Sequence, residues 1–459
     1  MKLKVYSPID NSVYVERSFA TQAEIDLAQT KAQAAQKLWC LSSLAEREEY
    51  CNAAVDFIVA NKEAIALELS WQMGRPIRYT PGEIDGFAER ARQMIATAKT
   101  ALAPIELPEK PGFIRYIKRE PLGVNLVIAP WNYPFLTTVN VVIPAIMAGN
   151  AVLLKSSAQT PLVAERFAQG FKQARLPEGV FQYLHLTHAD TEQLIRSPLI
   201  NAVAFTGSVA GGAMVERAAA GRFIPVGLEL GGKDPAYVRA DANLQHAVET
   251  VVDGAFFNSG QSCCGIERVY VHQDVYDEFV SKAVALVKQY KLGRSDDPET
   301  TLGPLVRASA ADFVREQINE ALDQGAIAQL NPQDFTLDKP GSAYLAPQVL
   351  TDVNHRMRIM QEESFGPVVG IMKVRSDAEA IALMNDSDYG LTAAVFTTDI
   401  AQGITLGEQL QTGTFFINRC DYLDPALAWT GVKNSGRGCT LSTLGYESLT
   451  RPKSFHIKM

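Results

Sequence analysis

Short apolar runs and amphipathic segments alternate along the chain from residue 123 onward. The run Gly123–Pro130 (GVNLVIAP) is rich in branched apolar residues and ends in proline, as a buried parallel strand does. It is followed by strand-like runs at 150–155, 180–184 and 200–205 and by helix-like segments at 161–174 and 212–220. This order predicts βαβ units, and therefore a sheet with helices on both faces.

A second series of the same kind begins after Gly232. We expect strands at 268–272, 368–374 and 392–397, helices at 275–288 and 308–323, and an irregular loop at 331–341. Before both series, Thr21 to about Ala103 reads as helix, because apolar residues recur there at helical spacing. A chain of 459 residues exceeds one ordinary core, so two or three domains are expected.

Charge and cysteine usage exclude several classes of protein. The 43 basic and 51 acidic residues give a net charge of -8 and form no basic stripe, so nucleic acid is not an expected partner. No apolar run reaches the roughly 18 residues of a membrane helix and no signal core follows Met1, which predicts a cytoplasmic protein with no membrane contact. The cysteines and histidines show no metal-ligand spacing, so no metal is expected.

Two segments offer a thiol and a carboxylate. In GQSCCGIER, Cys263 and Cys264 follow a Gly-Gln pair, where a thiol is either a nucleophile or an inert buried side chain. In ELGGK, Glu229 ends an apolar strand and is either a solvated glutamate or a general base, since the glycines behind it let ligands approach the backbone.

Three further segments are ambiguous when taken singly. PWNYP places Asn132 between two prolines, either as part of a rigid connector or as a donor to an oxyanion. FTGSVAGG lies between a strand and a helix. Its glycines either allow a tight turn of the backbone or let the backbone amides bind an anion. EESFGP places Glu363 close to the aromatic residue Phe365, and this motif alone does not indicate a function.

Together these segments resemble the aldehyde dehydrogenase superfamily, in its NAD(P)-dependent, non-acylating form. The matching stretches, in family order over nearly the whole chain, are PWNYP, KSSAQTP, FTGS, ELGGK, GQSCC, EESFGP and GVKNSGRG. The resemblance implies an α/β fold with a Rossmann-type NAD(P)-binding domain (residues 1–102 and 122–231), an α/β catalytic domain (232–445) and a β oligomerisation arm (103–121 and 446–459). A homodimer or homotetramer follows from that arm.

The resemblance also assigns roles to single residues. Cys263 would attack the aldehyde, Asn132 and the Cys263 backbone N–H would hold the oxyanion, and Glu229 would activate the water that hydrolyses the thioester. NAD or NADP would be held by Ala129, Pro130, Trp131, Lys155, Ser157, Ala158, Thr206, Gly207, Ser208, Leu230, Gly231, Glu363 and Phe365.

Several positions depart from the common family pattern. Ala158 stands where members that prefer NAD commonly have a glutamate, so NADP should be accepted. Val141 stands where many members have a lysine that relays protons, so the proton must leave by another route. The residues expected to line the substrate tunnel are Tyr133, Asn140, Phe257, Tyr422 and Trp429.

This set predicts an aromatic and apolar tunnel without a simple carboxylate clamp. Arg419 is the one nearby basic residue in sequence, and a structural or ion-pairing role is favoured for it. The alternatives to simple aldehyde oxidation are a semialdehyde dehydrogenase acting on a carboxylate-bearing substrate and a CoA-acylating enzyme, which Glu229 argues against. A cysteine hydrolase and a non-catalytic relative are disfavoured, because the cofactor motifs and the cysteine, asparagine and glutamate are all present.

Overall fold

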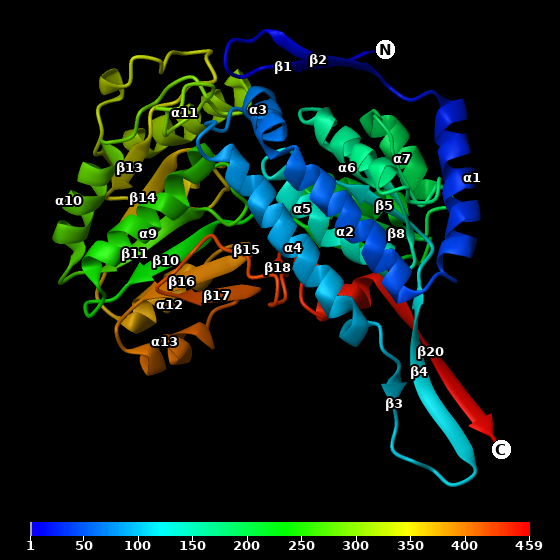
Figure 1. The fold of residues 1–459 in the computed structure, drawn as a ribbon. Coiled ribbons are helices and arrows are strands. Elements are labelled where there is room, and N and C mark those ends of the chain that lie inside the picture. The colour runs from blue at the N-terminus through cyan, green and yellow to red at the C-terminus, as the bar shows by residue number, and fades with distance from the viewer. Residues whose placement is uncertain (1) are drawn as a thin grey trace.

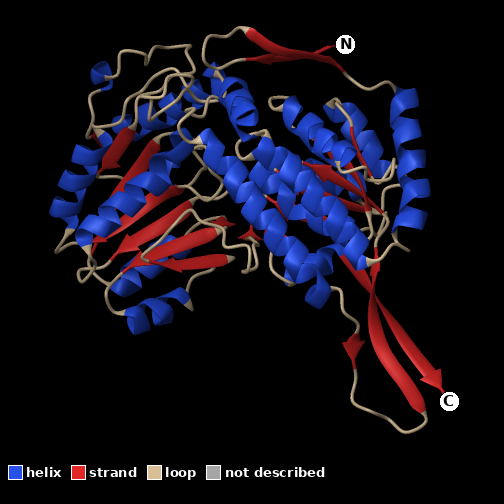
Figure 2. Ribbon diagram, in the orientation of Figure 1, coloured by secondary structure: helices blue, strands red, loops and turns tan. Residues whose placement is uncertain are grey.

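The structure is a computed structural model that describes residues 2–459. Helices surround two large, mainly parallel sheets, and a long antiparallel arm extends away from them (Figures 1 and 2). The chain begins with a hairpin of β1 (Lys2–Tyr6) and β2 (Val13–Ser18), which the sequence analysis did not predict. In β1 alternate residues are buried, the pattern of a strand with one covered face.

The segment expected to be helical forms four helices. Thr21 and Glu24 form a capping box at the start of the first. The helices are α1 (Gln22–Trp39), α2 (Leu44–Ala60), α3 (Lys62–Met73) and α4 (Thr80–Ala101).

A six-stranded sheet follows, with strand order β19-β9-β8-β5-β6-β7. All its pairs are parallel except β19–β9. The strands are β5 (Val124–Ile128), β6 (Ala151–Lys155), β7 (Phe181–Tyr183), β8 (Ala202–Thr206), β9 (Val226–Glu229) and, from far along the chain, β19 (Gly436–Arg437). The helices between them are α5 (Pro134–Met147), α6 (Pro161–Gln173), α7 (His188–Arg196) and α8 (Val209–Ala219).

The strand order of this sheet reverses at β5. The chain passes from β5 to β6 and β7 on one side, then crosses to β8 on the other side of β5. In doubly wound sheets the ligand crevice lies outside the carboxyl ends of the strands at such a reversal. The loops after β5 and β8 carry PWNYP and FTGS, so the topology brings these two motifs to one edge.

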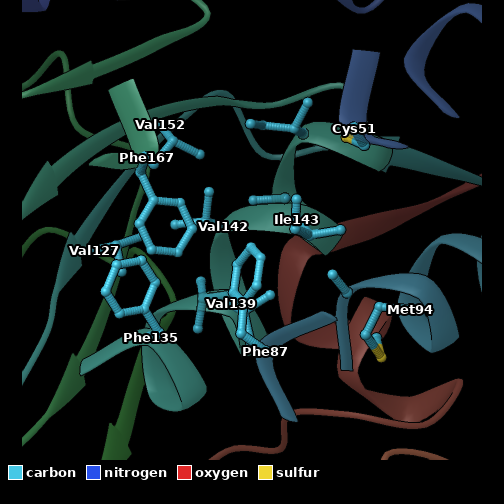
Figure 3. Packing of buried hydrophobic residues seen from close by; sticks show 14 of the residues in the cluster. Cys51, Phe87, Met94, Val127, Phe135, Val139, Val142, Ile143, Val152 and Phe167 are labelled. Carbon is cyan, nitrogen blue, oxygen red and sulfur yellow. The ribbon is translucent and has the colours of Figure 1, made fainter. Parts of the chain in front are cut away.

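Helices α2, α4, α5 and α6 pack together over one face of this sheet (Figure 3). Three aromatic rings join them: Phe87 of α4, Phe135 of α5 and Phe167 of α6, with ring centroids 5.5–5.9 Å apart. All three side chains are almost fully buried. Their packing fixes α4 and α5 against each other, and both helices contribute to the site described below.

A seven-stranded sheet forms the second core, in the order β12-β13-β14-β11-β10-β16-β17. Only the β12–β13 pair is antiparallel. The strands are β10 (Asp234–Val238), β11 (Ile266–His272), β12 (Ile327–Ala328), β13 (Gln348–Thr351), β14 (Val368–Val374), β16 (Thr392–Phe396) and β17 (Thr414–Ile417). Its helices are α9 (Leu244–Phe256), α10 (Tyr276–Val287), α11 (Ala308–Asp323), α12 (Asp377–Asn385) and α13 (Ile400–Gly407). The segment 331–341, expected as a loop, holds only the short 3-10 helix η2 (Pro332–Asp334).

The arm is a three-stranded antiparallel sheet in the order β20-β4-β3. Its strands are β3 (Ile105–Glu106), β4 (Phe113–Pro121) and β20 (Thr450–Lys458). Tyr116 stacks on Phe455 across the β4–β20 pair, with ring centroids 4.6 Å apart. Two segments that lie more than 300 residues apart in the sequence therefore pair with each other in the arm.

Minor elements complete the chain: β15 (Tyr389–Gly390), which pairs with β18 (Val432–Lys433), and the 3-10 helices η1 (Phe257–Gly260), η3 (Arg358–Met360) and η4 (Leu444–Leu449). Across residues 2–459, none of the helices has the length and apolar character to span a bilayer.

Candidate active site

The turn that carries Cys263 follows η1, whose backbone is unusual. Asn258, Ser259 and Gly260 all have φ between 53° and 72°, the left-handed region that side chains disfavour. A Cβ on Gly260 would lie 2.1 Å from the carbonyl oxygen of Gly366, so only glycine lets GQSCC approach the EESFGP turn this closely. The shape of the turn therefore depends on two sequence motifs at once.

The two adjacent thiols have different surroundings. Cys263 is partly exposed, whereas Cys264 is buried and its thiol donates to Asp421 Oδ1 at 2.9 Å. A hydrogen bond with Cys263 and burial raise the pKa of the Cys264 thiol well above its usual range. Cys264 thus stays protonated, and although both cysteines line the pocket, Cys263 is the one that is partly exposed.

Asp421 joins the residues on either side of Cys263. Its Oδ1 accepts from the Ser262 hydroxyl at 3.1 Å as well as from Cys264. Burial raises the pKa of Asp421 to about 6. The loop after β17 therefore holds the nucleophile turn from the side of the seven-stranded sheet.

Glu229 is the last residue of β9, at the carboxyl edge of the six-stranded sheet. Its carboxylate accepts hydrogen bonds from the hydroxyls of Thr440 and, at 3.3 Å, Thr206. Burial raises the pKa of Glu229, and the two threonine hydroxyls oppose that shift. A carboxylate of this kind is held in one direction and is more basic than a solvated one, as a general base requires.

Asn132 lies between β5 and α5, in the stiff PWNYP segment. Its Nδ2 donates to the carbonyl of Gln261, two residues before Cys263, at 3.2 Å. Asn258 Nδ2 donates to the same carbonyl at 3.2 Å. The amide is thereby fixed beside the nucleophile turn, with a second N–H left for another acceptor.

A buried arginine holds these segments together. Arg75, in the link between α3 and α4, donates to Glu83, to the Asn132 carbonyl and, at 3.2 Å, to Asn258 Oδ1. Glu83 in turn accepts from the backbone N–H of Phe135 at 2.8 Å. Neither Arg75 nor Glu83 has more than 2% of its side chain exposed, so the pair is fully desolvated.

All five predicted substrate residues line the same cavity as Cys263 and Glu229, which has a volume of about 510 Å³. These are Tyr133, Asn140, Phe257, Tyr422 and Trp429. The wall is less apolar than the sequence suggested, because α4 also contributes Asp85, Glu89 and Arg90. The expectation of an aromatic and apolar tunnel with no cation but Arg419 was incomplete.

Arg90 is the cation that sequence reasoning missed. Its Nη1 donates to the Leu136 carbonyl at 2.7 Å and weakly to Asn140 Oδ1 at 3.5 Å. Within residues 2–459 its Nε and Nη2 make no hydrogen bond and it forms no ion pair. Burial lowers the pKa of Arg90. In α4, Glu83 and Arg90 occupy the same buried face as Phe87 and Met94. Charged residues at such core-facing positions are a sequence signal that would have revealed Arg90.

Arg419 is exposed, and its guanidinium lies 3.6 Å from the centroid of the Tyr422 ring. The Tyr422 hydroxyl donates to Glu89 at 3.1 Å. Arg419 thus has an aromatic partner of its own, in keeping with a structural role.

The residues expected to hold a dinucleotide gather at the reversal of strand order. Ala129, Pro130 and Trp131 follow β5, Lys155, Ser157 and Ala158 end or follow β6, and Thr206, Gly207 and Ser208 link β8 to α8. Ser208 caps α8, whose amino end is an electropositive site for a phosphate. The Trp131 and Phe365 rings meet edge to face, with centroids 5.7 Å apart.

Two details fit a dinucleotide at this crevice. The Lys155 side chain is buried, which lowers its pKa, yet its Nζ has no hydrogen-bond or ion-pair partner in residues 2–459. An orphaned buried cation of this kind fits a ribose hydroxyl or phosphate. A Cβ on Gly231, next to Leu230, would lie 2.3 Å from Glu363 Oε2, so Glu363 reaches the backbone of ELGGK because glycine stands there. In the same described residues no cluster of three potential metal ligands is found.

Almost the whole chain matches one known protein family. The profile of the "Aldehyde dehydrogenase family" matches residues 1–455. The chain belongs to the aldehyde dehydrogenase family. It is an NAD(P)+-dependent aldehyde dehydrogenase, as the motifs predicted.

Relatives of this aldehyde dehydrogenase match it over most of its length. A succinate-semialdehyde dehydrogenase (NADP+) of Deinococcus radiodurans is 35% identical over 435 residues, which cover 95% of this chain and 90% of the relative. One from Mycobacterium avium is 34% identical over 418 residues, 91% and 88% of the two chains.

Solved structures confirm the predicted fold class. The succinic semialdehyde dehydrogenase of Streptococcus pyogenes in complex with NADP+ has a TM-score of 0.95 at 29% identity, covering 100% of both chains. The NADP-dependent glyceraldehyde-3-phosphate dehydrogenase of Bacillus halodurans complexed with NADP has a TM-score of 0.94 at 32% identity, covering 100% of this chain and 96% of that one.

The buried pair predicts a distinctive response to mutation. Arg75→Met leaves Glu83 buried without its cation, so we expect the free energy of unfolding to fall by about 3–5 kcal/mol and kcat to fall because Asn132 and Asn258 lose their shared donor. The double variant Arg75→Met/Glu83→Gln removes both charges and should regain part of the stability without regaining kcat. Denaturant unfolding and steady-state kinetics check both. A single variant as stable and as active as the wild type would contradict the role given to Arg75.

Proposed function

We propose that Cys263 is the nucleophile of this enzyme and that its substrate is a semialdehyde with a carboxylate at the far end. The observation that carries the proposal is one cavity of about 510 Å³ lined by Cys263, Glu229 and the unpaired cation of Arg90. A sulfur, a carboxylate base and a cation are the groups that attack an aldehyde, activate water and bind a carboxylate, respectively.

In the first half-reaction the Cys263 thiolate attacks the aldehyde carbon and forms a thiohemiacetal. Asn132 Nδ2 and the Cys263 backbone N–H donate to the oxyanion, a type of contact worth roughly 10²- to 10³-fold in rate. NAD(P)+, when bound, would supply the acceptor for the hydride that leaves this carbon. In the second half-reaction Glu229 takes a proton from the water that attacks the resulting thioester, and the acid is released.

The cofactor would lie at the crevice between β5 and β8. Lys155 and Glu363 would bind its two riboses and the amino end of α8 its pyrophosphate, with Phe365 against the nicotinamide end. The free Nζ of Lys155 and the approach of Glu363 to the ELGGK backbone support this assignment. Burial raises the pKa of Glu363 to about 8, so the proposed ribose contact uses either form of this carboxyl group near neutral pH.

The substrate class rests on Arg90. Its Nε and Nη2 face no partner among the described residues, and a bidentate carboxylate satisfies both donors at once. The similar proteins from Deinococcus radiodurans and Mycobacterium avium are named for succinate semialdehyde, whose carboxylate lies three carbons from the aldehyde. A short dicarboxylic semialdehyde therefore suits this pocket.

A second candidate is an amino aldehyde, because Asp85 and Glu89 also line the cavity and carry negative charge. Both are already engaged, Asp85 with Lys62 at 3.1 Å and Glu89 with Tyr422 at 3.1 Å. Arg90, in contrast, has free donors. A CoA-acylating reaction is disfavoured, since Glu229 is held as a water-activating base.

NADP is the proposed preferred cofactor. Ala158 is exposed just after β6 and carries no charge that would repel a 2′-phosphate, and Lys155 lies three residues before it. The two named relatives are NADP enzymes, which supports the same preference.

We also propose that the arm of β3, β4 and β20 joins copies of the chain into a homodimer or homotetramer. The proposed cofactor domain consists of residues 1–102 and 122–231, and the proposed catalytic domain consists of residues 232–445. One edge of β20 is unpaired within residues 2–459, and Ile114 and Ile457 on the arm are exposed. The six free cysteines suit the reducing cytoplasm that we propose as its compartment.

Removal of the base should separate the two half-reactions. Glu229→Gln is expected to give one rapid burst of reduced cofactor per site and then turn over roughly 10²-fold more slowly or worse, because water is no longer activated. Glu229 acts only when ionised and burial raises its pKa, so wild-type hydrolysis should fall as pH drops through a pKa above the usual glutamate range. Stopped-flow absorbance over a pH series measures both. A fully active variant would assign water activation to another group.

The proposed contact between Arg90 and the substrate carboxylate should affect the choice between acidic and neutral aldehydes. Arg90→Met is expected to lower kcat/KM for succinate semialdehyde by about 100-fold, the worth of a charge-assisted bidentate contact, and to leave butyraldehyde nearly unchanged. Arg419→Ala is the matched control, since Arg419 is exposed and stacked on Tyr422. The readout is the ratio of kcat/KM for succinate semialdehyde to kcat/KM for butyraldehyde. If this ratio changes in the Arg419 variant but not in the Arg90 variant, the assignment of Arg90 is wrong. If the wild-type enzyme prefers amino aldehydes, the second candidate function is supported instead.

A charge at position 158 should change the choice of cofactor. Ala158→Glu is expected to lower kcat/KM for NADP by about tenfold or more through repulsion of the 2′-phosphate and to spare NAD. Ala158→Gln adds the same bulk without charge and should have the smaller effect. Initial rates with both cofactors test this, and a wild type that favours NAD by two orders of magnitude would refute the preference.

A further inference from the structure

Glu267 is a buried carboxylate that the proposed chemistry does not use. It lies near the start of β11, shortly after the turn of Cys263, and its side chain is 5% exposed. Within residues 2–459 it is not among the residues that line the substrate pocket. A buried carboxylate is costly unless it is paired and hydrogen-bonded, so its partners show which segments it holds.

The pairing of β10 with β11 is irregular at Glu267. These parallel strands place Asp234 opposite Ile266 and Pro235 opposite Arg268, so Glu267 is an extra residue on β11. Bulges of this kind are rare in parallel pairs, and they occur preferentially next to active sites, where they redirect a side chain. At this bulge the Glu267 side chain contacts the EESFGP turn, which precedes β14.

The carboxylate of Glu267 accepts hydrogen bonds from two successive backbone N–H groups of that turn. Ser364 N–H donates to Oε2 at 2.8 Å and Phe365 N–H donates to Oε1 at 2.8 Å. Phe365 has a φ of 53°, in the left-handed region that bulky side chains disfavour. Successive N–H groups in a turn of this type form a concavity that binds an anion. Glu267 is the anion here, and it stabilises a backbone conformation that is costly for Phe365.

Lys233 is the counter-ion of Glu267. Its Nζ donates to Glu267 Oε2 at 2.5 Å and to the Ser364 hydroxyl at 3.0 Å, and its side chain is fully buried. The backbone N–H of the preceding residue, Gly232, donates to Glu363 Oε1 at 3.1 Å. The end of ELGGK and the bulge on β11 therefore hold the EESFGP turn together.

This turn carries Glu363 and Phe365, the two residues assigned above to the nicotinamide end of the dinucleotide. Burial and, after it, the negative charge of Glu267 raise the pKa of Glu363 to about 8, so the two carboxyl groups interact across the turn. In residues 2–459 every hydrogen bond of the Glu267 side chain goes to Lys233, Ser364 or Phe365. The groups assigned to the adenosine end are not among these partners.

We propose that Glu267 is a positioning residue for the cofactor, and that with Lys233 it fixes the turn of Glu363 and Phe365 in the conformation that receives the nicotinamide half of NAD(P)+. This inference rests on the proposed cofactor site. Because Glu267 contacts only the turn at one end of that site, its loss should weaken binding of the nicotinamide half and spare the adenosine half.

The variant Glu267→Gln tests the assignment by binding alone. Glutamine keeps the size of the side chain but has one acceptor oxygen fewer, so at least one donor loses its partner. Isothermal titration calorimetry gives the Kd of NADP+ and of 2′,5′-ADP, which contains the adenosine half without the nicotinamide half. We expect the Kd of NADP+ to rise about tenfold, because the turn is no longer pre-organised, and the Kd of 2′,5′-ADP to stay within about twofold of wild type.

Two further variants control for an effect on folding. Lys233→Met/Glu267→Gln removes both buried charges, so it should fold even if the single variant does not, and it should show the same selective loss of NADP+ binding. Asp377→Asn is the matched control. Asp377 joins α12 to β10 by accepting from the Tyr237 hydroxyl at 2.8 Å, and in residues 2–459 it does not line the substrate pocket. This variant should leave both dissociation constants unchanged.

Alkylation of Cys263 separates this role from support of the nucleophile turn, which precedes Glu267 in the chain. Iodoacetamide is added without cofactor, and mass spectrometry follows the modification of the Cys263 peptide. In Glu267→Gln the rate should stay within about twofold of wild type. A rate reduced tenfold or more would place the effect on the thiol and would overturn the proposal.

The variant Glu363→Ala distinguishes failure of this inference from failure of the proposed cofactor site. If Glu363→Ala binds NADP+ as tightly as the wild type, the proposed cofactor site is wrong and the inference fails with it. If Glu363→Ala weakens NADP+ binding but Glu267→Gln and the double variant do not, only the positioning role fails. Equal weakening of NADP+ and 2′,5′-ADP in Glu267→Gln would also overturn that role.

Discussion

The buried guanidinium of Arg75 is the contact on which the site's geometry depends. It joins α4 through Glu83, the loop after β5 through the Asn132 carbonyl, and η1 through Asn258. These three segments belong to different parts of the chain, and the last two carry the proposed oxyanion donor and the turn before the nucleophile. A desolvated charge is costly unless it is paired and hydrogen-bonded, so these three contacts restrain the three segments relative to one another.

Burial also raises the pKa of three carboxyl groups at the site. It raises the pKa of Asp421 to about 6 and that of Glu363 to about 8, and it raises the pKa of Glu229 as well. The three groups are then held by hydroxyls, a thiol or a backbone N–H rather than by cations.

Local sequence could predict much of the site, because family motifs occupy contiguous stretches. Glycines that permit close approach, such as Gly260 and Gly231, and the order of strands and helices were visible without coordinates. Arg75 and Arg90 were not recognised, because their partners are distant in sequence and their helical surroundings read simply as amphipathic. The hairpin at the start of the chain and the central strand β10 were missed for a related reason: short strands gain their stability from neighbours that periodicity does not reveal.

The buried amide of Asn125 illustrates the same limit. The sequence showed that Val141 carries no proton relay, but Asn125 lies inside a β-branched run and read only as part of a strand. Its lack of partners becomes evident when β5 is seen beside β8 and facing α5. Buried polar and charged residues whose partners lie far away in sequence are thus the ones for which three-dimensional structure adds most.

The most direct test of the central claim is to locate the acyl group. The wild-type enzyme is mixed with succinate semialdehyde and NADP+, quenched with acid, digested, and the peptide containing Cys263 and Cys264 is fragmented in a mass spectrometer. The account predicts an acyl group on Cys263 and an unmodified Cys264. An acyl group on Cys264, or on neither thiol while reduced cofactor accumulates, would contradict it.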